Sequence, residues 1–437
     1  MRVSQLITKT RKDAPADETA KNAQLLIRAG YVHKDSAGVY VWLPLGRKVL
    51  NNIISIIREE MDGIGGQEVV MSTLQRKELW EKTNRWDDEQ VDVWFKSHYK
   101  NGSEVGLAWS HEEQMVDTFR QFVDSYKDLP KSTYQFQNKM RNEIRAKSGI
   151  MRTREFIMKD MYSFSRSEQE HKDFYDKVTE AYITIFKRLG IGDSTYFTFA
   201  SGGAFAEFSH EFQTICDAGE DVIYIDDEKH IAINEEVLRD DVLKNLGVER
   251  ASLREVKAAE VGNIFSFGTS KSEPLEFTFT DESGEKQYVV MGSYGIGPAR
   301  VMGVIVELMG DDSGIIWPKN IAPYKAQIVS LGADEAVLAD AKRLHDTLLE
   351  AGMETLWDDR DLSAGEKFAD ADLMGMPYRI VVSKKTIESG TYEVKVRNTG
   401  EVEYRNESDL QSMLQIKKGC YNRPDEFWRE GSKGIES

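Results

Sequence analysis

QNKMRNEIRAKSGIMRTREFIMKDMYSF, residues 137–164, is the most informative stretch of the chain. Between Lys139 and Lys159 it carries seven Lys or Arg and two Glu, although the whole chain has a formal net charge of -17. The pattern predicts two strands joined by a turn at residues 147–149. Such a hairpin would aim several guanidinium groups at one polyanion, since each guanidinium gives phosphate two parallel hydrogen bonds. The alternative is a solvated charged hairpin, because charged surface pairs are common.

The composition describes an ordinary globular chain. Its 437 residues suffice for two or three domains, and 40% are hydrophobic and 30% charged. No stretch approaches the roughly 20 apolar residues of a membrane helix, and no apolar signal segment begins the chain. We therefore expect a cytoplasmic protein without membrane contact. The acidic balance argues against indiscriminate nucleic-acid binding but permits a confined basic surface.

Cysteine and histidine usage argues against a structural metal site. Only Cys216 and Cys420 occur, too few for a disulfide framework or a cysteine-rich zinc site. The seven His show no close pairing in the sequence. We expect no structural metal, and Cys216 is interpreted as a small buried hydrophobe.

The periodicity of apolar residues predicts two kinds of architecture. A helix between Gly46 and Gly63, a strand over residues 67–74 and a helix over residues 168–189 frame the cationic stretch. The polar segment 221–260 contains one expected helix, at residues 235–246. Beyond residue 322 strands and helices alternate, which implies a sheet covered by crossover helices. The expected elements there are strands at 326–331, 354–357, 378–383 and 392–397, and helices at 334–351, 364–374 and 407–416.

Five strings in order carry a family resemblance that covers about residues 1 to 417. The cationic stretch resembles motif 2 of class II aminoacyl-tRNA synthetases, in the form found in prolyl-tRNA synthetases. The other four are Ser110-His111-Glu112-Glu113, Ser209-His210-Glu211-Phe212, the segment GNIFSFGT at residues 262–269 and the segment GSYGIGPAR at residues 292–300. Each string alone is weak, whereas the ordered set is specific.

The resemblance implies an overall α/β fold class with two domains. Residues 1–322 would form an α+β catalytic domain with an antiparallel sheet and flanking helices, and residues 323–417 an α/β anticodon-binding domain. The helix and strand after Gly46 resemble motif 1, which builds a homodimer interface in this family. The short segment 221–260 stands where many bacterial members carry an editing domain, so a separate editing protein is a possible partner. The tail 418–437 matches no part of the pattern and is expected to be disordered or to dock through Trp428.

The resemblance also implies residues that bind ATP, which would arrive with Mg²⁺ whose protein ligands stay unknown. Arg141 would hold the α-phosphate together with the substrate carboxylate, and Arg141 and Arg300 would be the catalytic residues. Glu143 would contact the adenine side, while Arg152 and Arg300 would neutralise the outer phosphates. Thr269 would complete the nucleotide contacts with Ser266, which replaces a usual Gln.

A proline site and a tRNA contact follow from the same resemblance. Glu112 would pair with the ammonium of L-proline, beside a wall of apolar and small residues; the full set is Ser110, Glu112, Arg141, Met158, Phe164 and Ser293. Several residues differ from the usual family pattern, among them Trp109, Ser110, Ser293 and Phe205-Ala206-Glu207. Arg145 and Lys147 would contact the acceptor end of tRNA(Pro), or would be plain surface charges.

The sequence therefore predicts a homodimeric class II synthetase that forms an aminoacyl-adenylate from proline and ATP and transfers proline to its tRNA. Two alternatives stay open at this point. A paralogue of the same class could activate another amino acid, because Phe205, Glu207 and Ser293 alter the pocket. A non-catalytic paralogue could bind RNA, although the retained Arg141, Glu143, Arg152 and Arg300 argue against it.

Overall fold

The computed structural model describes residues 1–201 and 208–414. Phe205-Ala206-Glu207 and the tail 418–437 lie outside these ranges. The chain forms two compact units. Among the described residues, the first unit contains 36–39, 53–201 and 208–304, and the second contains 1–35, 40–52 and 305–414. The predicted domain boundary at residues 322 and 323 stays a prediction.

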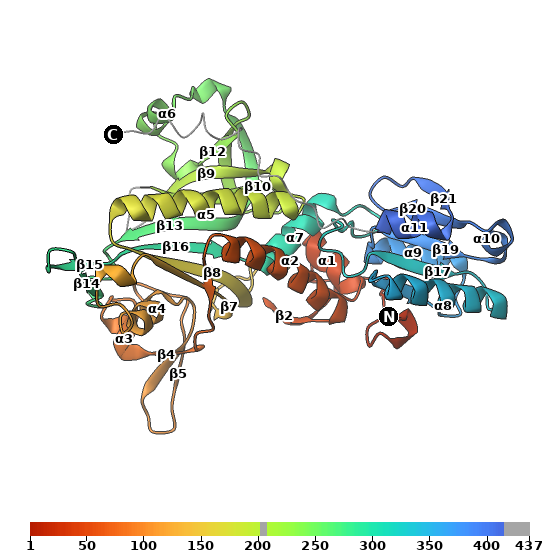
Figure 1. Cartoon of the computed structure of the whole chain (residues 1–437), viewed down its shortest axis with the longest axis horizontal. Coiled ribbons are helices and arrows are strands. Elements are labelled where there is room, and N and C mark those ends of the chain that lie inside the picture. Colours follow the sequence, from red (N-terminus) through yellow and green to blue (C-terminus); the bar gives the residue numbers. More distant parts are fainter. Residues whose placement is uncertain (202–207, 415–437) are drawn as a thin grey trace. The chain divides into compact units, whose positions relative to one another are not determined.

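A mostly antiparallel sheet, nine-stranded over the described residues, forms the centre of the first unit. Its strands follow the order β10-β9-β12-β11-β13-β16-β8-β7-β3, and β10 also pairs with β13. Helix α5 (Glu168–Arg188) runs along one face of the sheet, as Figure 1 shows. The strands are β3 (Gln67–Glu68), β7 (Lys131–Met140), β8 (Glu155–Ser165), β9 (Thr195–Ser201), β10 (Phe208–Ile215), β11 (Asp221–Asp226), β12 (Ile231–Asn234), β13 (Arg254–Gly268) and β16 (Val290–Ile296).

The strand register decides which side chains share the face opposite α5. Directly paired residues of antiparallel strands point to the same side, and side chains alternate along each strand. Lys159 and His210 contact Tyr182 and Tyr175 of α5, so their neighbours in sequence point the other way. That opposite face is called the site face here. It carries Gln135, Gln137, Lys139, Phe156, Met158, Asp160, Tyr162, Glu211, Asn263, Phe265 and Ser293.

The segment after helix α2 (Pro44–Gly63) differs from the predicted strand at residues 67–74. Only β3 and the first residue of β4 (Leu74–Arg76) are strand there. Side-chain amides of β7 replace the backbone ladder in between: Gln135 Oε1 accepts from the amide of Met71 at 2.9 Å, and Gln137 Nε2 donates to the carbonyl of Met71. Side-chain contacts of this kind leave no periodic signal in the sequence.

The segment 221–260 folds as small local structure in place of an inserted domain. It forms β11, β12, helix α6 (Asp240–Leu246), two short 3₁₀ turns and the beginning of β13. The helix predicted at residues 235–246 is broken into a 3₁₀ turn at Glu235–Val237 and α6. Arg239 between them is extended and donates its backbone amide to Val237, so the helix does not continue.

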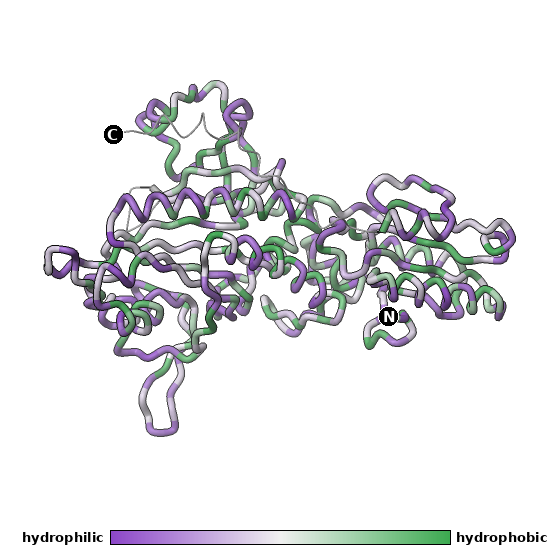
Figure 2. Tube along the Cα trace, in the orientation of Figure 1, coloured by the Kyte–Doolittle hydropathy of each residue, from purple (hydrophilic) through white to green (hydrophobic). Residues whose placement is uncertain are grey.

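The remaining elements of the first unit lie outside the large sheet. A small sheet has the order β4-β6-β5, and β14 pairs with β15. Figure 2 shows hydrophilic residues at the tip between β5 and β6. The elements are α3 (Lys77–Glu81), β5 (Phe95–His98), β6 (Glu104–Leu107), α4 (Glu112–Phe119), β14 (Thr278–Thr280) and β15 (Lys286–Tyr288), while α7 (Pro298–Met309) begins in this unit.

The second unit contains a mixed five-stranded sheet among its described residues, with the order β18-β17-β19-β20-β21. Strand β17 runs parallel to β18 and β19, which confirms the predicted strand and helix alternation. The inner strands β17 and β19 are the richest in hydrophobic residues, with the sequences AQIVS and YRIVV. The elements are β17 (Ala326–Ser330), α8 (Glu335–Glu350), β18 (Thr355–Asp358), α9 (Ala364–Met374), β19 (Tyr378–Val382), α10 (Lys384–Ser389), β20 (Tyr392–Val396), β21 (Val402–Arg405) and α11 (Glu407–Leu414).

Helix α1 (Lys21–Arg28) also belongs to the second unit, and β1 (Val32–Ser36) pairs with β2 (Val39–Trp42). The sequence did not predict α10 or β21, which are both short. None of the helices in the described ranges is both long and apolar enough to cross a membrane.

Candidate active site

The cationic stretch forms the predicted antiparallel pair, with Met140 of β7 opposite Glu155 of β8. The arginines, however, lie in the connection between the strands, residues 141–154, which is longer than the predicted turn. Ser148 and Gly149 adopt left-handed backbone conformations there, with φ of 59° and 62°. Arg154 anchors the connection, because it donates to the carbonyls of Glu143 at 3.0 Å and Ala37 at 2.7 Å. The connection is therefore an ordered loop that holds its arginines in place.

Arg141 follows β7 directly and points its guanidinium into a partly buried space. Its Nε donates to the carbonyl of Trp109 at 3.4 Å, and the guanidinium carbon lies 5.3 Å from the ring centre of Phe156. Burial and the nearby Arg300 lower the pKa of Arg141. Two cations close to each other in a poorly solvated space favour the binding of an anion between them.

Arg300 of α7 reaches the same space from the other side of the sheet centre. Its Nε donates to the carbonyl of Met151 at 3.0 Å, and Nη1 donates to the carbonyl of Glu260 at 2.9 Å. Glu260 also pairs with it at 3.3 Å through a carboxylate oxygen. The connection 141–154 and strand β13 thus hold Arg300 near Arg141.

Arg152, Glu143 and Glu220 form an ion-pair cluster beside Arg141. Arg152 pairs with Glu143 at 2.9 Å and with Glu220 at 2.7 Å, and its hydrogen bond to Glu143 raises its pKa. Lys147 lies 3.5 Å from Glu220, whereas Arg145 is exposed. Glu220 therefore forms ion pairs with two cations of the connection 141–154, which is called the motif 2 loop here.

Ser110 and Glu112 lie on a loop that ends at the first turn of α4. Ser110 Oγ donates to Glu112 Oε1 at 2.6 Å, and both residues are buried. Arg85 and the buried Lys271 place positive charge beside the two glutamates of this loop. A carboxylate held in this way is suited to bind an ammonium group.

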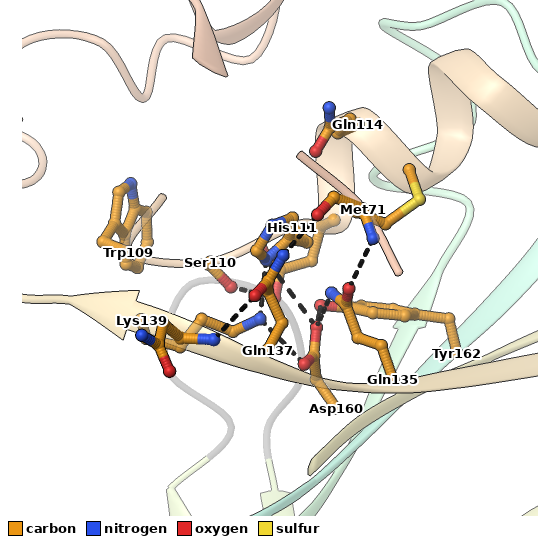
Figure 3. A network of polar contacts seen from close by, with 12 residues as sticks. Met71, Trp109, Ser110, His111, Gln114, Gln135, Gln137, Lys139, Asp160 and Tyr162 are labelled. Atoms are coloured by element: carbon orange, nitrogen blue, oxygen red, sulfur yellow. Dashed lines mark hydrogen bonds and ion pairs between the residues drawn. The ribbon is translucent and has the colours of Figure 1, made fainter. Parts of the chain in front are cut away.

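A buried network fixes the same loop from below, as Figure 3 shows. Lys139 Nζ lies 2.6 Å from His111 Nδ1 and 2.7 Å from Asp160 Oδ1. Asp160 Oδ2 accepts from Gln135 at 2.9 Å and from Tyr162 at 3.0 Å. Burial and the neighbouring Lys139 lower the pKa of His111 to about 4, so the ring is neutral at pH 7.

The structure brings only some of the remaining predicted residues to this place. Met158 and Ser293 lie half-buried on the site face. Phe164 is buried in an apolar cluster, where its ring lies 5.5 Å from that of Phe277. Ser266 pairs with Gly292, a position that points toward the face of α5, and Thr269 bonds Glu273 in the turn after β13.

An acidic group lies where β10, β11 and β13 meet. Burial, with Glu260 close by, raises the pKa of Glu211 to about 8, and Gln213 donates to Glu211 at 2.8 Å and to Asp221 at 2.7 Å. In the described ranges no group of three or more His, Cys, Asp or Glu is arranged to hold a metal ion by itself. The raised pKa means that Glu211 is mostly protonated at pH 7 in these surroundings.

His210 points toward α5 and away from the site face. Its Nδ1 lies 2.5 Å from the hydroxyl of Tyr175, its ring stacks on Phe197 at 4.5 Å, and burial lowers its pKa to about 4. Sequence reasoning missed other members of the site: Arg85, Phe156, Asp160, Glu220, Glu260 and Lys271. Phe156, Asp160 and Glu260 have a signal, since each lies within or next to a quoted motif on a strand. Arg85, Glu220 and Lys271 lie in loops without one.

Comparison with known proteins identifies the class and the family of this chain. The model of the class II tRNA synthetase core domain (G, H, P, S and T) matches residues 94–309, and the anticodon binding domain model matches residues 325–416. Proline–tRNA ligase of Maricaulis maris is 36% identical and covers 95% of this chain and 98% of its own length. That of Phenylobacterium zucineum is 37% identical and covers 92% and 97%. Fold and sequence thus define a class II aminoacyl-tRNA synthetase. The chain belongs to the proline–tRNA ligase family.

Solved structures show the same fold at low sequence identity. The prolyl-tRNA synthetase of Cryptosporidium parvum in complex with L-proline and AMP aligns with a TM-score of 0.73 at 18% identity, and covers 90% of this chain and 73% of that chain. The same enzyme with halofuginone and AMPPNP aligns with a TM-score of 0.75. These matches confirm the predicted fold.

Proposed function

We propose that the chain activates L-proline with ATP to prolyl-adenylate and then transfers the prolyl group to the 3′ end of tRNA(Pro). The observation that carries this proposal is the convergence of Arg141, Arg300 and Glu112 in the first unit. A carboxylate oxygen of proline attacks the α-phosphorus, the bond to the bridging oxygen breaks, and pyrophosphate leaves. Such a displacement needs positioned charges and no nucleophilic side chain.

Different charged residues contact different parts of ATP. Arg141 holds the α-phosphate and the proline carboxylate in contact, which converts the reaction into an intramolecular one. Arg152 and Arg300 neutralise the outer phosphates, and Glu143 contacts the adenine side. Glu220 pairs with Arg152 and Lys147 and so marks the position that a phosphate would take. Ser266 and Thr269 keep their predicted roles in ATP binding without support from the strand register.

Magnesium fits this site as a companion of ATP. Mg²⁺ commonly binds through one or two carboxylates together with substrate phosphates and water. Glu211 and Glu260 offer such carboxylates, and a bound cation would favour the ionised form of Glu211, whose pKa burial and Glu260 raise to about 8. The ion supplies charge neutralisation of the phosphates when bound.

Proline binds beside the loop of Ser110 and Glu112. Glu112 binds the secondary ammonium of proline, and Ser110 fixes the Glu112 carboxylate by a hydrogen bond. Met158 and Ser293 line the site face beside Glu112. Phe164 supports this wall from the apolar cluster behind it.

The partners follow from the same assignment. The second unit, with its anticodon-binding domain, takes tRNA(Pro), and Arg145 and Lys147 meet the acceptor end. Two chains associate as a homodimer through the segment after α2, where Val70 and Leu74 are 75% and 48% exposed. The cytoplasm is the expected location.

Exchange of labelled pyrophosphate into ATP tests the activity. We expect strong exchange with proline and weaker exchange with alanine, whose kcat/KM should be about 10 to 200 times lower, because a pocket loses little by binding a smaller side chain. A preference for another amino acid would leave the class II chemistry and refute the specificity. Silence with the whole amino-acid panel, from a folded protein, would refute the activity and favour a non-catalytic RNA-binding paralogue.

A second prediction concerns the hydrolysis of mischarged tRNA. Because the segment 221–260 holds only β11, β12, α6 and short turns, we expect the chain to lack hydrolytic editing and to release alanyl-tRNA(Pro) intact. A separate editing protein would then have to remove it. The measurement is the decay of alanyl-tRNA(Pro) with and without the enzyme. Faster decay with the enzyme than in buffer alone would contradict this expectation.

A further inference from the structure

Arg85 packs its guanidinium against two neighbouring tryptophan rings. Its guanidinium carbon lies 4.4 Å from the ring centre of Trp109 and 5.1 Å from that of Trp80. Its own backbone is fixed too, because its amide donates to the carbonyl of Trp80 at 3.0 Å and its carbonyl accepts from Trp94 Nε1 at 2.8 Å. The two rings are neighbours, with ring centres 5.5 Å apart, so they pack against the guanidinium together and help to set its direction.

One edge of that guanidinium points at Glu112 and Glu113 in the first turn of α4. Arg85 Nη1 lies 2.8 Å and 3.0 Å from the two carboxylate oxygens of Glu113 and 3.2 Å from Glu112 Oε2. Glu113 is fully buried and also pairs with Lys271 at 3.2 Å. Arg85 is thus the cation that bridges the two carboxylates.

Glu112 depends on a counter-charge of this kind. The residue is only 7% exposed, and burial alone would favour the neutral acid. Burial raises the pKa of Glu112, but Arg85, followed by Lys271, more than offsets it and holds the pKa at about 2. A protonated Glu112 would have no charge to offer an ammonium group.

We propose that Arg85 is a specificity-determining positioning residue, which holds Glu112 ionised and correctly turned for the ammonium of the amino-acid substrate. This inference rests on the proposed function of Glu112. It adds a residue from the loop after α3 that belongs to none of the family motifs in the sequence.

The hydrogen-bond geometry leaves room for the substrate without displacing Arg85. Each carboxylate oxygen accepts about two hydrogen bonds. Ser110 donates to Glu112 Oε1, Arg85 donates to Oε2, and the backbone amide of Glu112 also donates to the carboxylate, which leaves one of about four acceptor positions for an ammonium N–H. Arg85 can therefore stay in place while the substrate binds.

Other charged groups surround Glu112, and they do not remove the need for Arg85. His111 is neutral at pH 7, and burial lowers the pKa of Lys139, which donates to Asp160. The groups that face Glu112 besides Arg85 are Glu113, Lys271, His111, Lys139, Arg141 and Tyr162.

The test is Arg85→Met in the full chain, with the KM for proline measured by pyrophosphate exchange between pH 5.5 and 9. Met keeps apolar packing against the two rings and removes the charge. We expect the KM for proline to rise at least about tenfold at pH 6 and to approach the wild-type value as pH increases, since Glu112 would then titrate within this range. The wild type should show no such dependence, and the KM for ATP should stay unchanged.

Two variants complete the set. Arg85→Lys keeps a positive charge and should restore most of the proline affinity at pH 6. Arg76→Met is the matched control, because Arg76 pairs with Asp117 and is 65% exposed. Its proline KM should equal that of the wild type at each pH. If Arg85→Met fails to fold by circular dichroism, Arg85→Met with Glu113→Gln keeps Lys271 against one carboxylate and should show the same trend.

The outcomes separate this inference from the proposed function. An unchanged proline KM in Arg85→Met, or a rise by the same factor at every pH, would overturn it, because a role in shape alone has no pH dependence. Glu112→Gln is measured in parallel. If Glu112→Gln leaves the proline KM unchanged, the placement of the proline site is wrong and the inference falls with it. If only Glu112→Gln weakens proline binding, the inference alone is wrong.

Discussion

Replacing Arg141 by Ala should reduce proline-dependent pyrophosphate exchange by about 10³-fold or more while the protein stays folded. Arg141 is the residue that touches both reacting groups in the proposed geometry. In the structure its guanidinium makes one long hydrogen bond, 3.4 Å to Trp109, so the fold loses little when the side chain is removed. Burial and Arg300 lower the pKa of Arg141, and a bound anion would favour its charged form.

Three measurements make the Arg141 prediction specific. Arg141→Lys keeps a charge but loses the fork that binds two oxygens at once, so we expect it to recover only a small part of the activity. Arg166→Ala serves as control, because Arg166 pairs with Glu170 at the beginning of α5, away from the site face. Circular dichroism should be the same for all variants. Full exchange activity in Arg141→Ala would remove the central assignment.

The sequence predicted the frame of this site well because strands and helices leave periodic signals. The pairing of β7 with β8, helix α5 and the alternation of the second unit were all predicted, and α9 has the predicted bounds. Periodicity says nothing about the roles of Arg141 and Arg300. Those roles were predicted from the resemblance to class II synthetases. The family comparison confirms the class, while the roles of Arg141 and Arg300 stay a prediction.

What the sequence did not predict are contacts that depend on the direction of one side chain. Gln135 and Gln137 replace a backbone ladder, which turned the predicted strand at residues 67–74 into irregular structure. Ser266 differs from Phe265 only by one position, yet that position decides which face of the sheet it points to. No motif string contains that information.

Arg85 and Glu220 illustrate a second limit. Both lie in loops and owe their place to residues far along the chain, Glu112 and Arg152. A charge in a loop is usually a solvated surface residue, and nothing in its neighbours in sequence distinguishes these two. Their roles emerge only when the loops are placed beside the strands.

Lys139 belongs to the cationic stretch in the sequence, but its side chain is completely buried in the structure. Its ammonium lies between Asp160 and His111 and is the centre of the network in Figure 3. Lys139→Met should lower the free energy of unfolding by about 3 to 5 kcal/mol, because it leaves the Asp160 carboxylate buried with only neutral donors. Denaturant unfolding followed by tryptophan fluorescence measures this change, since the Trp80, Trp94 and Trp109 rings pack beside the same loop.

Two further variants distinguish a lost ion pair from a lost packing contact. Lys139→Met with Asp160→Asn removes both charges and should recover much of the lost stability, because a buried pair replaced by neutral groups is often nearly neutral in free energy. Lys77→Met is the surface control: Lys77 pairs with Glu104 in partly exposed surroundings, and its loss should cost no more than about 1 kcal/mol. Equal destabilisation in the single and double variants would show that packing dominates.

The ion pair of Lys139 with Asp160 also affects function, because Lys139 contacts His111. With Lys139 charged, His111 accepts at Nδ1 and donates from Nε2 to the carbonyl of Ser72, which fixes the loop before Glu112. Because the pKa of His111 is lowered to about 4, its contribution to stability is present above about pH 6.5 and is lost as pH falls toward 4. Lys139→Met should therefore raise the KM for proline as well, at all pH values above 6.5. That pH-independent loss separates the network around Lys139 from the pH-dependent loss expected for Arg85.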